Sequence, residues 1–220
     1  MTATSPERLT ARAAQAEETR ARIIAAAVEL FSESSYDEVG VLDIAKAAGV
    51  ANGLLFHYFG SKRGLYVEAM HTAAEELVQA FIFNSDLPPS QQIRDALASH
   101  LDYLATHRGL ALRLVLGGRG ADPKAWEAFE AGRWRAVEAT AELMGLDYKR
   151  PAVQMAGRAI VSAIDEATVY WLQNGETFNR DSLVEWMVEM AYAAVGAAAK
   201  LDDALDVDAA MERTLGSATT

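Results

Sequence analysis

Residues 39–62 read VGVLDIAKAAGVANGLLFHYFGSK, and this stretch decides the fold of the N-terminal part of the chain. Ile44, Ala45 and Ala48 give a first short helix an apolar seam, and the small side chain of Ala45 permits close contact with another helix. Gly49 then supplies a tight turn, because glycine adopts positive φ without steric cost. The pattern predicts two short helices joined by a glycine-containing turn.

The second of these helices has one apolar side and one outward side. Leu55 and Phe59 are four residues apart and are expected to point inward. Polar and aromatic residues remain for the outward side: Asn52, Gly53, Leu54, His57 and Tyr58. Two short helices of this kind describe a helix-turn-helix, in which the second helix enters the major groove of DNA.

The stretch resembles the TetR/AcrR family of transcriptional repressors. That family shows an Ile-Ala pair, Ala-Gly-Val, a glycine, an aromatic block containing histidine and a closing Ser-Lys pair. The corresponding residues here are Ile44-Ala45, Ala48-Gly49-Val50, Gly53, Phe56-His57-Tyr58-Phe59 and Ser61-Lys62. The match covers residues 17–80. It implies an all-α protein that binds a double-stranded DNA operator as a homodimer, a repressor released from a palindromic operator by a small-molecule effector.

Four positions depart from the family pattern. Gly40 and Ala51 stand where the family has Thr or Ser as helix N-caps, and Phe56 and Tyr58 stand where it has Tyr and His. Replacing a Ser or Thr cap by Ala costs about 0.5–2 kcal/mol, and replacing it by Gly costs only a few tenths. We expect a somewhat different DNA contact on an intact scaffold.

The candidate DNA-binding residues are Gly40, Ala51, Asn52, Gly53, Leu54, His57, Tyr58 and Lys62. Asn52 suits a bidentate contact with adenine, although a solvated asparagine at a helix end is the alternative. Leu54 could touch a thymine methyl or simply cover the helix pair. Lys62 suits a phosphate, because it combines an ammonium group with a helix N-terminus, and an ordinary surface lysine is the alternative.

The rest of the chain is helical in pattern, and we expect about nine helices. They cover residues 17–34, 41–48, 51–58, 61–84, 91–106, 108–116, 122–144, 151–174 and 181–200. The first three form the helix-turn-helix module, and the long fourth helix joins it to a C-terminal helical bundle for ligand binding and dimerisation.

The expected domain boundaries follow from these helices. Residues 1–16 form a flexible arm, 17–77 the DNA-binding domain with its helix-turn-helix at about 40–59, 78–200 the bundle and 201–220 a tail.

Composition narrows the function classes. The 220 residues include no cysteine, which removes disulfides, Cys-ligated metals and thiol nucleophiles. The net charge is −11, but residues 1–66 hold 7 basic and 8 acidic residues, so nearly all the excess acid lies in residues 67–220. Residues 44–63 contain three basic residues and no acidic one, which permits local docking on phosphate.

The bundle carries charged and aromatic residues on otherwise apolar helices. Arg113, Trp126, Phe129, Arg133, Asp165 and Tyr170 are the candidate ligand-binding residues. Aromatic walls favour a partly hydrophobic effector, and the arginines suggest that it carries an anionic group. The alternatives are internal ion pairs or a dimer interface for the charges, and plain core for the aromatic residues.

Dimerisation is expected through residues 151–174 and 181–200, whose small-residue faces permit close packing. Those faces comprise Ala156, Ala159, Ala163, Ala167, Ala191, Ala194, Ala197 and Ala198, with Trp186, Met187 and Met190 adding apolar area.

The sequence contains few features that are typical of other function classes. The spacings of His71 and Glu75 and of His100 and His107 permit helical metal pairs, but without a third convergent ligand we expect no metal site, no cofactor and no catalytic residue. A helical ligand-binding protein or enzyme without DNA binding is the alternative function. No signal peptide or membrane span is evident, so a cytoplasmic protein is expected, associated with the nucleoid when bound to DNA. The residues do not distinguish a repressor from an activator.

Overall fold

A computed structural model describes residues 6–109, 112, 123–175 and 177–215. These residues form nine helices and no strand, which confirms the all-α prediction. The helices are α1 (Pro6–Glu33), α2 (Val41–Ala47), α3 (Asn52–Phe59), α4 (Lys62–Ala80), α5 (Pro89–Thr106), α7 (Pro123–Leu143), α8 (Pro151–Gln173), α9 (Arg180–Ala198) and α10 (Val207–Leu215). Of the helix expected at 108–116, residues 110–111 and 113–116 lie outside the described part of the chain.

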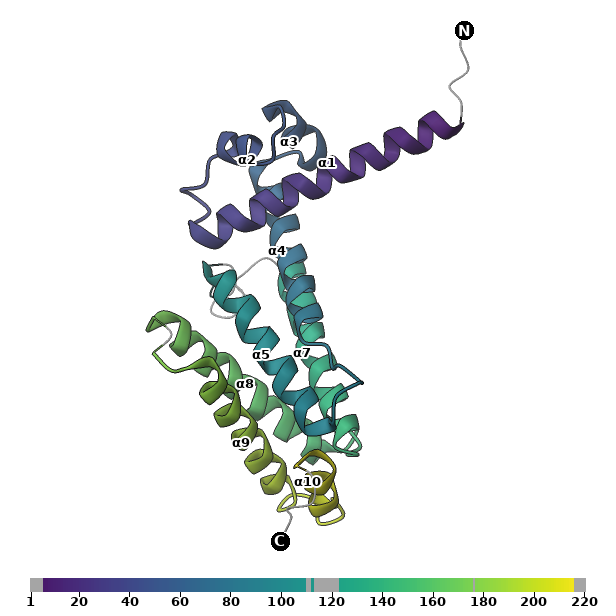
Figure 1. The fold of residues 1–220 in the computed structure, drawn as a ribbon, viewed down its shortest axis with the longest axis vertical. Coiled ribbons are helices and arrows are strands. Elements are labelled where there is room, and N and C mark those ends of the chain that lie inside the picture. Colours follow the sequence, from purple (N-terminus) through teal and green to yellow (C-terminus); the bar gives the residue numbers. More distant parts are fainter. Residues whose placement is uncertain (1–5, 110–111, 113–122, 176, 216–220) are drawn as a thin grey trace.

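The helices α1, α2 and α3 gather at one end of the molecule, at the top of Figure 1. Their apolar faces meet around Ile23, Phe31, Ile44 and Leu55, which are all almost completely buried. Ala45 is also buried, as the small-residue seam predicts. Gly49 has φ of 66° and turns the chain between α2 and α3, so the predicted helix-turn-helix is present.

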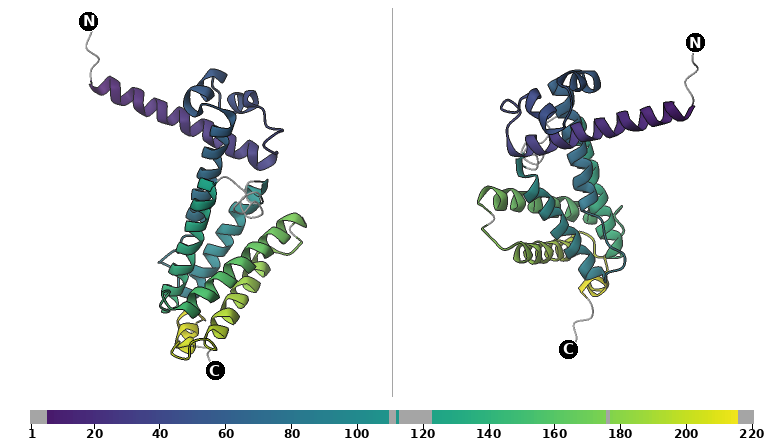
Figure 2. Two further views of the ribbon diagram at one scale, coloured as in Figure 1. Left: turned by 180° about the vertical axis from the view of Figure 1, so that it is seen from behind. Right: turned by 45° about the horizontal axis from the view of Figure 1, so that its top comes forward.

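The first helix is longer than the sequence predicts. It begins at Pro6, not at residue 17, so most of the expected flexible arm is helical. Proline suits the first helical position because its φ is preset, and the Ala, Arg, Leu and Glu that follow are strong helix formers. Helix propensity therefore accounts for the extension of α1, whose first turns project from the body in both views of Figure 2.

The helix α4 links the N-terminal module to the bundle. Its N-cap is Ser61, whose Oγ accepts a hydrogen bond from the Gly64 N–H at 3.0 Å, as expected. The helix ends at Ala80, earlier than the predicted residue 84, because Asn84 forms its own turn by accepting a bond from the Asp86 N–H. The face that α4 buries contains Leu65, Ala69 and Leu77.

The bundle consists of α4, α5, α7, α8 and α9. The helix α4 packs along α7, α5 contacts α4 and α9, and α8 pairs with α9. Figure 2 shows this pair side by side at the edge of the bundle. None of the described helices is long and apolar enough to span a membrane.

The expected tail contains a helix of nine residues, α10, that belongs to the bundle. Ala210 and Thr214 are buried, and the Tyr192 hydroxyl donates a hydrogen bond to the carbonyl oxygen of Thr214 at 3.3 Å. The helix packs against α5 and α9 at the end farthest from α3 (Figure 1). The apolar pattern of this segment is too short to predict a helix, because the helix gains its stability from tertiary contact.

Candidate nucleic-acid interface and ligand cavity

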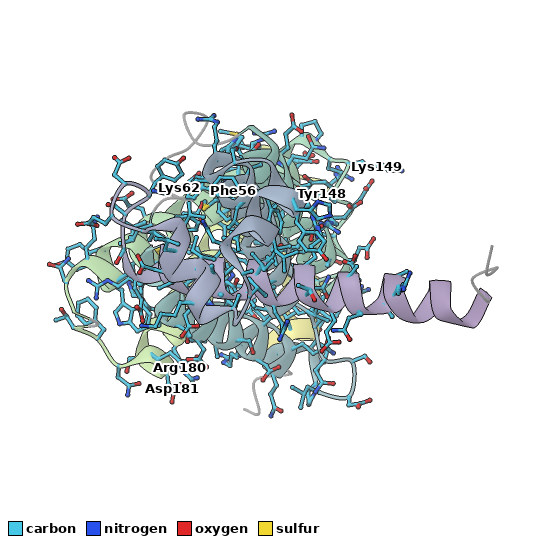
Figure 3. All side chains as sticks on the ribbon, turned by 90° about the horizontal axis from the view of Figure 1, so that it is seen from above. Phe56, Lys62, Tyr148, Lys149, Arg180 and Asp181 are labelled. Atoms are coloured by element: carbon cyan, nitrogen blue, oxygen red, sulfur yellow. The ribbon has the colours of Figure 1, made fainter. Side chains whose placement is uncertain are left out.

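The outer face of α3 presents the predicted residues to solvent. Leu55 is buried beneath the helix, whereas Asn52, Gly53, Leu54 and His57 are exposed. Tyr58 is half-buried and packs against the core. Phe56, which Figure 3 labels with Lys62 in the view onto this end, is 48% exposed. A large exposed aromatic beside polar groups is typical of a surface that meets a partner.

The N-termini of α2 and α3 lack side-chain caps. Gly40 and Ala51 are the N-cap residues, and neither forms a side-chain cap hydrogen bond, as the departures from the family pattern predict. The first N–H groups of each helix are therefore open to solvent or to a phosphate oxygen.

Gly53 is a glycine that the protein's own fold does not require. Its φ is not positive, and a Cβ placed there would meet no atom within 4 Å. Glycine is less favourable than alanine by about 1 kcal/mol inside a helix and by less in the first turn, where Gly53 lies. The missing side chain is useful where another molecule approaches the backbone closely, as DNA approaches a recognition helix.

Aromatic rings hold the cations beside α3. The Lys62 ammonium lies 4.4 Å from the ring centroid of Tyr36, and Lys62 is half-buried. Arg20 lies over the Phe59 ring at 5.5 Å and pairs with Glu68 of α4. Such contacts restrict flexible side chains, so Lys62 is held in place at the start of α4.

A long apolar cavity lies within the bundle. Side chains from α4, α5, α7, α8 and α9 line it, and Leu205 contributes at one end. Its volume is about 130 Å³. On α8 the lining extends from Val153 to Asp165, which corresponds to about 18 Å at 1.5 Å per residue. The cavity is therefore narrow and long.

The cavity has a charged group in its wall. Arg133 of α7 donates to Asp165 of α8 at 2.6 Å and to Glu130 at 3.1 Å, and the Arg133 and Asp165 side chains are only 16% and 18% exposed. Burial raises the pKa of Asp165 to about 6, against the opposing effect of Arg133. With all three groups ionised, the cluster carries one net negative charge.

The structure brings together three of the predicted ligand-binding residues. Phe129, Arg133 and Asp165 line the cavity. Trp126 is half-buried against Phe129, with ring centroids 5.6 Å apart, and does not line it. Tyr170 is 54% exposed on the outer side of α8, and Arg113 lies outside the described residues.

Two family models match the chain. "Bacterial regulatory proteins, tetR family" matches residues 23–69, and "Tetracyclin repressor-like, C-terminal domain" matches residues 89–194. The chain belongs to the tetR family. It is a DNA-binding transcriptional regulator, as the helix-turn-helix indicates.

Relatives of this tetR-family chain match over most of its length. The transcriptional activator FasR of Mycolicibacterium smegmatis is 27% identical over 188 residues, which are 81% of this chain and 84% of FasR. The fatty acid metabolism regulator of Bacillus subtilis is 23% identical over 189 residues, which are 79% of this chain and 94% of the length of that regulator.

Solved tetR-family structures share the fold. A tetR-family regulator from Streptomyces coelicolor is 25% identical, with a TM-score of 0.80 over 90% of this chain and 89% of its own. FadR from Bacillus subtilis, solved in complex with stearoyl-CoA, is 22% identical. Its TM-score is 0.60 over 77% of this chain and 96% of the FadR chain. These relatives are regulators, so the alternative of a ligand-binding protein or enzyme without DNA binding has no support among them.

Sequence reasoning about this tetR-family member missed two polar residues of the cavity wall, Thr140 and His100. His100 of α5 lines the cavity beside Phe81, with ring centroids 5.7 Å apart. The sequence places His100 one turn after Ala96 and Leu97 on a helix with an apolar face, which only weakly indicates a buried position. Among the described residues, no group of three His, Asp or Glu side chains could hold a metal ion.

Proposed function

We propose that the protein is a homodimeric repressor that binds a palindromic operator and is released by a long-chain acyl ligand held in the bundle cavity. The observation that carries the proposal is the position of the cavity against α4. Leu77, Val78 and Phe81 of α4 line it, and the other end of the same helix begins beside α3. One rigid element thus joins the ligand site to the DNA-binding module.

The dimensions and polarity of the cavity favour a linear apolar ligand. An extended alkyl chain advances about 1.25 Å per carbon, given C–C bonds of about 1.5 Å, so about 18 Å accommodates about 14 carbons. The lining is almost wholly aliphatic and aromatic. FadR of Bacillus subtilis is a relative solved with stearoyl-CoA, which makes an acyl chain the leading candidate here.

The small volume of the cavity supplies the physical basis of release. Ligand pockets usually enclose about 300–1,000 Å³, whereas this one encloses about 130 Å³. A long-chain ligand therefore has to separate the helices to enter. It consequently favours a conformation in which α4 is displaced, and binding shifts the population away from the DNA-binding conformation.

Displacement of α4 acts on DNA binding through geometry. The two recognition helices of a dimer must be one helical repeat of DNA apart, about 34 Å, to occupy successive major grooves. A shift of α4 in each protomer changes that spacing. A ligand that prefers the displaced conformation about 100-fold supplies roughly 2.7 kcal/mol of coupling.

The outer face of α8 and α9 is the proposed dimer interface. It exposes large apolar side chains, with Met155 and Tyr170 on α8 and Trp186 on α9, and Leu201 just beyond α9. The small residues between them include Ala159, Ala193 and Ala197, which are exposed. Four residues expected in the interface do not face outward: Met187 is fully buried, and Ala156, Ala191 and Ala198 line the cavity. The sequence pattern could not separate the two apolar sides of these helices.

An activator is a second candidate, because FasR is named an activator and aligns over 81% of this chain. The two functions differ in the effect of the DNA-bound protein on transcription. A repressor bound at its operator lowers transcription of the target gene, whereas a bound activator raises it.

The ligand proposal is tested by titrating tetradecanoyl-CoA into the protein and following the heat of binding. Ala136 of α7 lines the cavity, and Ala131 of the same helix is exposed. We expect binding by the native protein and by Ala131→Phe, and at least tenfold weaker binding by Ala136→Phe. Equal binding by both variants would place the ligand elsewhere, and no binding by the native protein would contradict the acyl ligand.

A further inference from the structure

Two buried polar atoms of the cavity wall have no hydrogen-bond partner. They are His100 Nδ1 and Arg133 Nε, and within the described part of the chain they are the only buried side-chain nitrogen or oxygen atoms without one. Both residues line the same cavity. An unsatisfied buried polar group costs about 1–3 kcal/mol, so such groups in native proteins call for an explanation.

His100 differs from its neighbour on the same helix. The Nδ1 of His107 lies 3.1 Å from the carbonyl oxygen of Tyr103, the usual local partner four residues back. His100 makes no corresponding bond, and its ring packs edge-on against Phe81 at 89°. Burial lowers the pKa of His100 to about 4, so at neutral pH the ring is uncharged and offers one donor and one acceptor.

The Nε–H of Arg133 is a buried donor that is free to bind a ligand. Two other guanidinium nitrogens of Arg133 each donate to a carboxylate, of Glu130 and Asp165, whereas Nε–H has no partner. The two carboxylates already exceed the charge of the guanidinium, so an anionic group would be repelled. The remaining donor therefore favours an uncharged acceptor such as a carbonyl oxygen, in contrast to the anionic group that the sequence suggested.

The packing of α4 relates the levels of Arg133 and His100 along the cavity. A Cβ on Gly132, next to Arg133, would lie 2.0 Å from Val78 Cγ2, so α7 and α4 touch at this level. Phe81, which contacts His100, follows Val78 by three residues, a rise of about 4.5 Å at 1.5 Å per residue. That rise corresponds to about four carbons of an extended chain, at about 1.25 Å per carbon.

We propose that the effector is an acyl thioester with a second oxygen, a hydroxyl or oxo group, a few carbons from its carbonyl. Arg133 Nε–H donates to the thioester carbonyl oxygen, and His100 forms a hydrogen bond with the second oxygen. The inference rests on the proposed acyl ligand and adds the chemical feature that the site selects. A site that bonds a ligand oxygen discriminates strongly against a ligand without it, because its own polar group is then left unpaired.

The test compares tetradecanoyl-CoA with 5-hydroxytetradecanoyl-CoA, whose hydroxyl lies four carbons from the carbonyl carbon, by calorimetric titration. We expect the hydroxylated thioester to bind about tenfold more tightly, equivalent to about 1.4 kcal/mol. His100→Phe keeps an aromatic ring but no hydrogen-bonding atom, and we expect it to abolish the preference. His100→Gln restores a donor and an acceptor and should recover part of it. The matched control, His107→Phe, should leave the preference unchanged.

The outcomes separate this inference from the proposed function. Equal binding of the two thioesters by the native protein overturns the inference and leaves the acyl ligand standing. A preference that persists in His100→Phe, in a variant whose thermal unfolding is cooperative, overturns the role of His100. If neither thioester binds, both the inference and the acyl-ligand proposal are wrong.

Discussion

At the scale of a single residue, Gly53 is expected to favour DNA binding at the expense of helix stability. A Cβ there meets no protein atom within 4 Å, so Gly53→Ala is expected to raise the free energy of unfolding through helix propensity, by up to about 0.5 kcal/mol in the first turn of α3. The same methyl group lies on the proposed DNA-contacting face, so operator affinity should fall. Urea unfolding and fluorescence anisotropy with operator DNA measure the two effects. A variant that is both more stable and equally tight on DNA would contradict our placement of α3.

Asn52 and Lys62 should differ in how they affect DNA recognition. Lys62→Ala is expected to weaken binding to all sequences about equally and to reduce the slope of log K against log salt by about 1. Asn52→Ala should instead change sequence preference, by about 1–3 kcal/mol at one base pair. Salt titrations on operator and unrelated DNA separate the two. Unchanged operator affinity in both variants would mean that α3 does not read the groove.

Asp165 should give stability a recognisable pH dependence. Because its pKa is raised from 3.8 to about 6 in the folded state, the folded protein binds this proton more tightly than the unfolded chain does. Asp165 therefore contributes about 3 kcal/mol to the free energy of unfolding below about pH 4. This contribution is lost as the pH rises through about 6. Asp165→Asn should lack this loss when unfolding is measured by urea between pH 4 and pH 7.

Asp202 provides the control of opposite sign. Arg150 hydrogen-bonds Asp202 and holds the pKa of that half-buried carboxyl below its usual value. Its contribution is present above the unfolded pKa and lost as the pH falls, so Asp202→Asn should not remove the loss between pH 4 and pH 6. If Asp165→Asn retains the full pH dependence of the native protein, the carboxyl is not buried as described.

At the scale of helices, the contact between α4 and α7 determines whether the cavity can act on the DNA-binding module. Gly132 allows the two helices to touch, because a Cβ there would lie 2.0 Å from Val78 Cγ2. Gly132→Ala should destabilise the protein by about 1–3 kcal/mol of overpacking, despite its gain in helix propensity. Thermal unfolding with Gly53→Ala as control measures this, since both changes add one methyl to a helix. A rise in melting temperature in both variants would show that the contact is loose.

The sequence was most informative where structure is local. The helix-turn-helix follows from Ala45, Gly49 and Leu55, because short-range spacing and one positive-φ glycine determine it. The helices α1 and α10 were misjudged, since propensity alone extends the first and tertiary contact stabilises the second. The cavity group was only partly predictable, because His100 and Tyr170 both lie on amphipathic helices and only packing decides which one faces inward.

At the scale of the whole molecule, the exposed face of α8 and α9 should determine the oligomeric state. Each chain has a mass of 23.8 kDa, and we expect a species of twice that mass in sedimentation at micromolar concentration. Trp186→Glu places a charge in the proposed interface and should produce monomers. The control variant Ile82→Glu carries the same charge at an exposed apolar residue outside the proposed interface, and it should remain dimeric. A native protein that sediments as a monomer would contradict the proposed interface.

The measurement that tests the central claim most directly is operator affinity with and without the acyl ligand. Labelled DNA from upstream of the protein's own gene is titrated with native protein and Ala136→Phe, in the absence and presence of saturating tetradecanoyl-CoA, and anisotropy gives each Kd. We predict that the ligand raises the Kd of the native protein at least tenfold, about 1.4 kcal/mol of coupling, and leaves that of Ala136→Phe nearly unchanged. A Kd that stays the same while the ligand demonstrably binds would contradict the claim that the cavity controls DNA binding through α4.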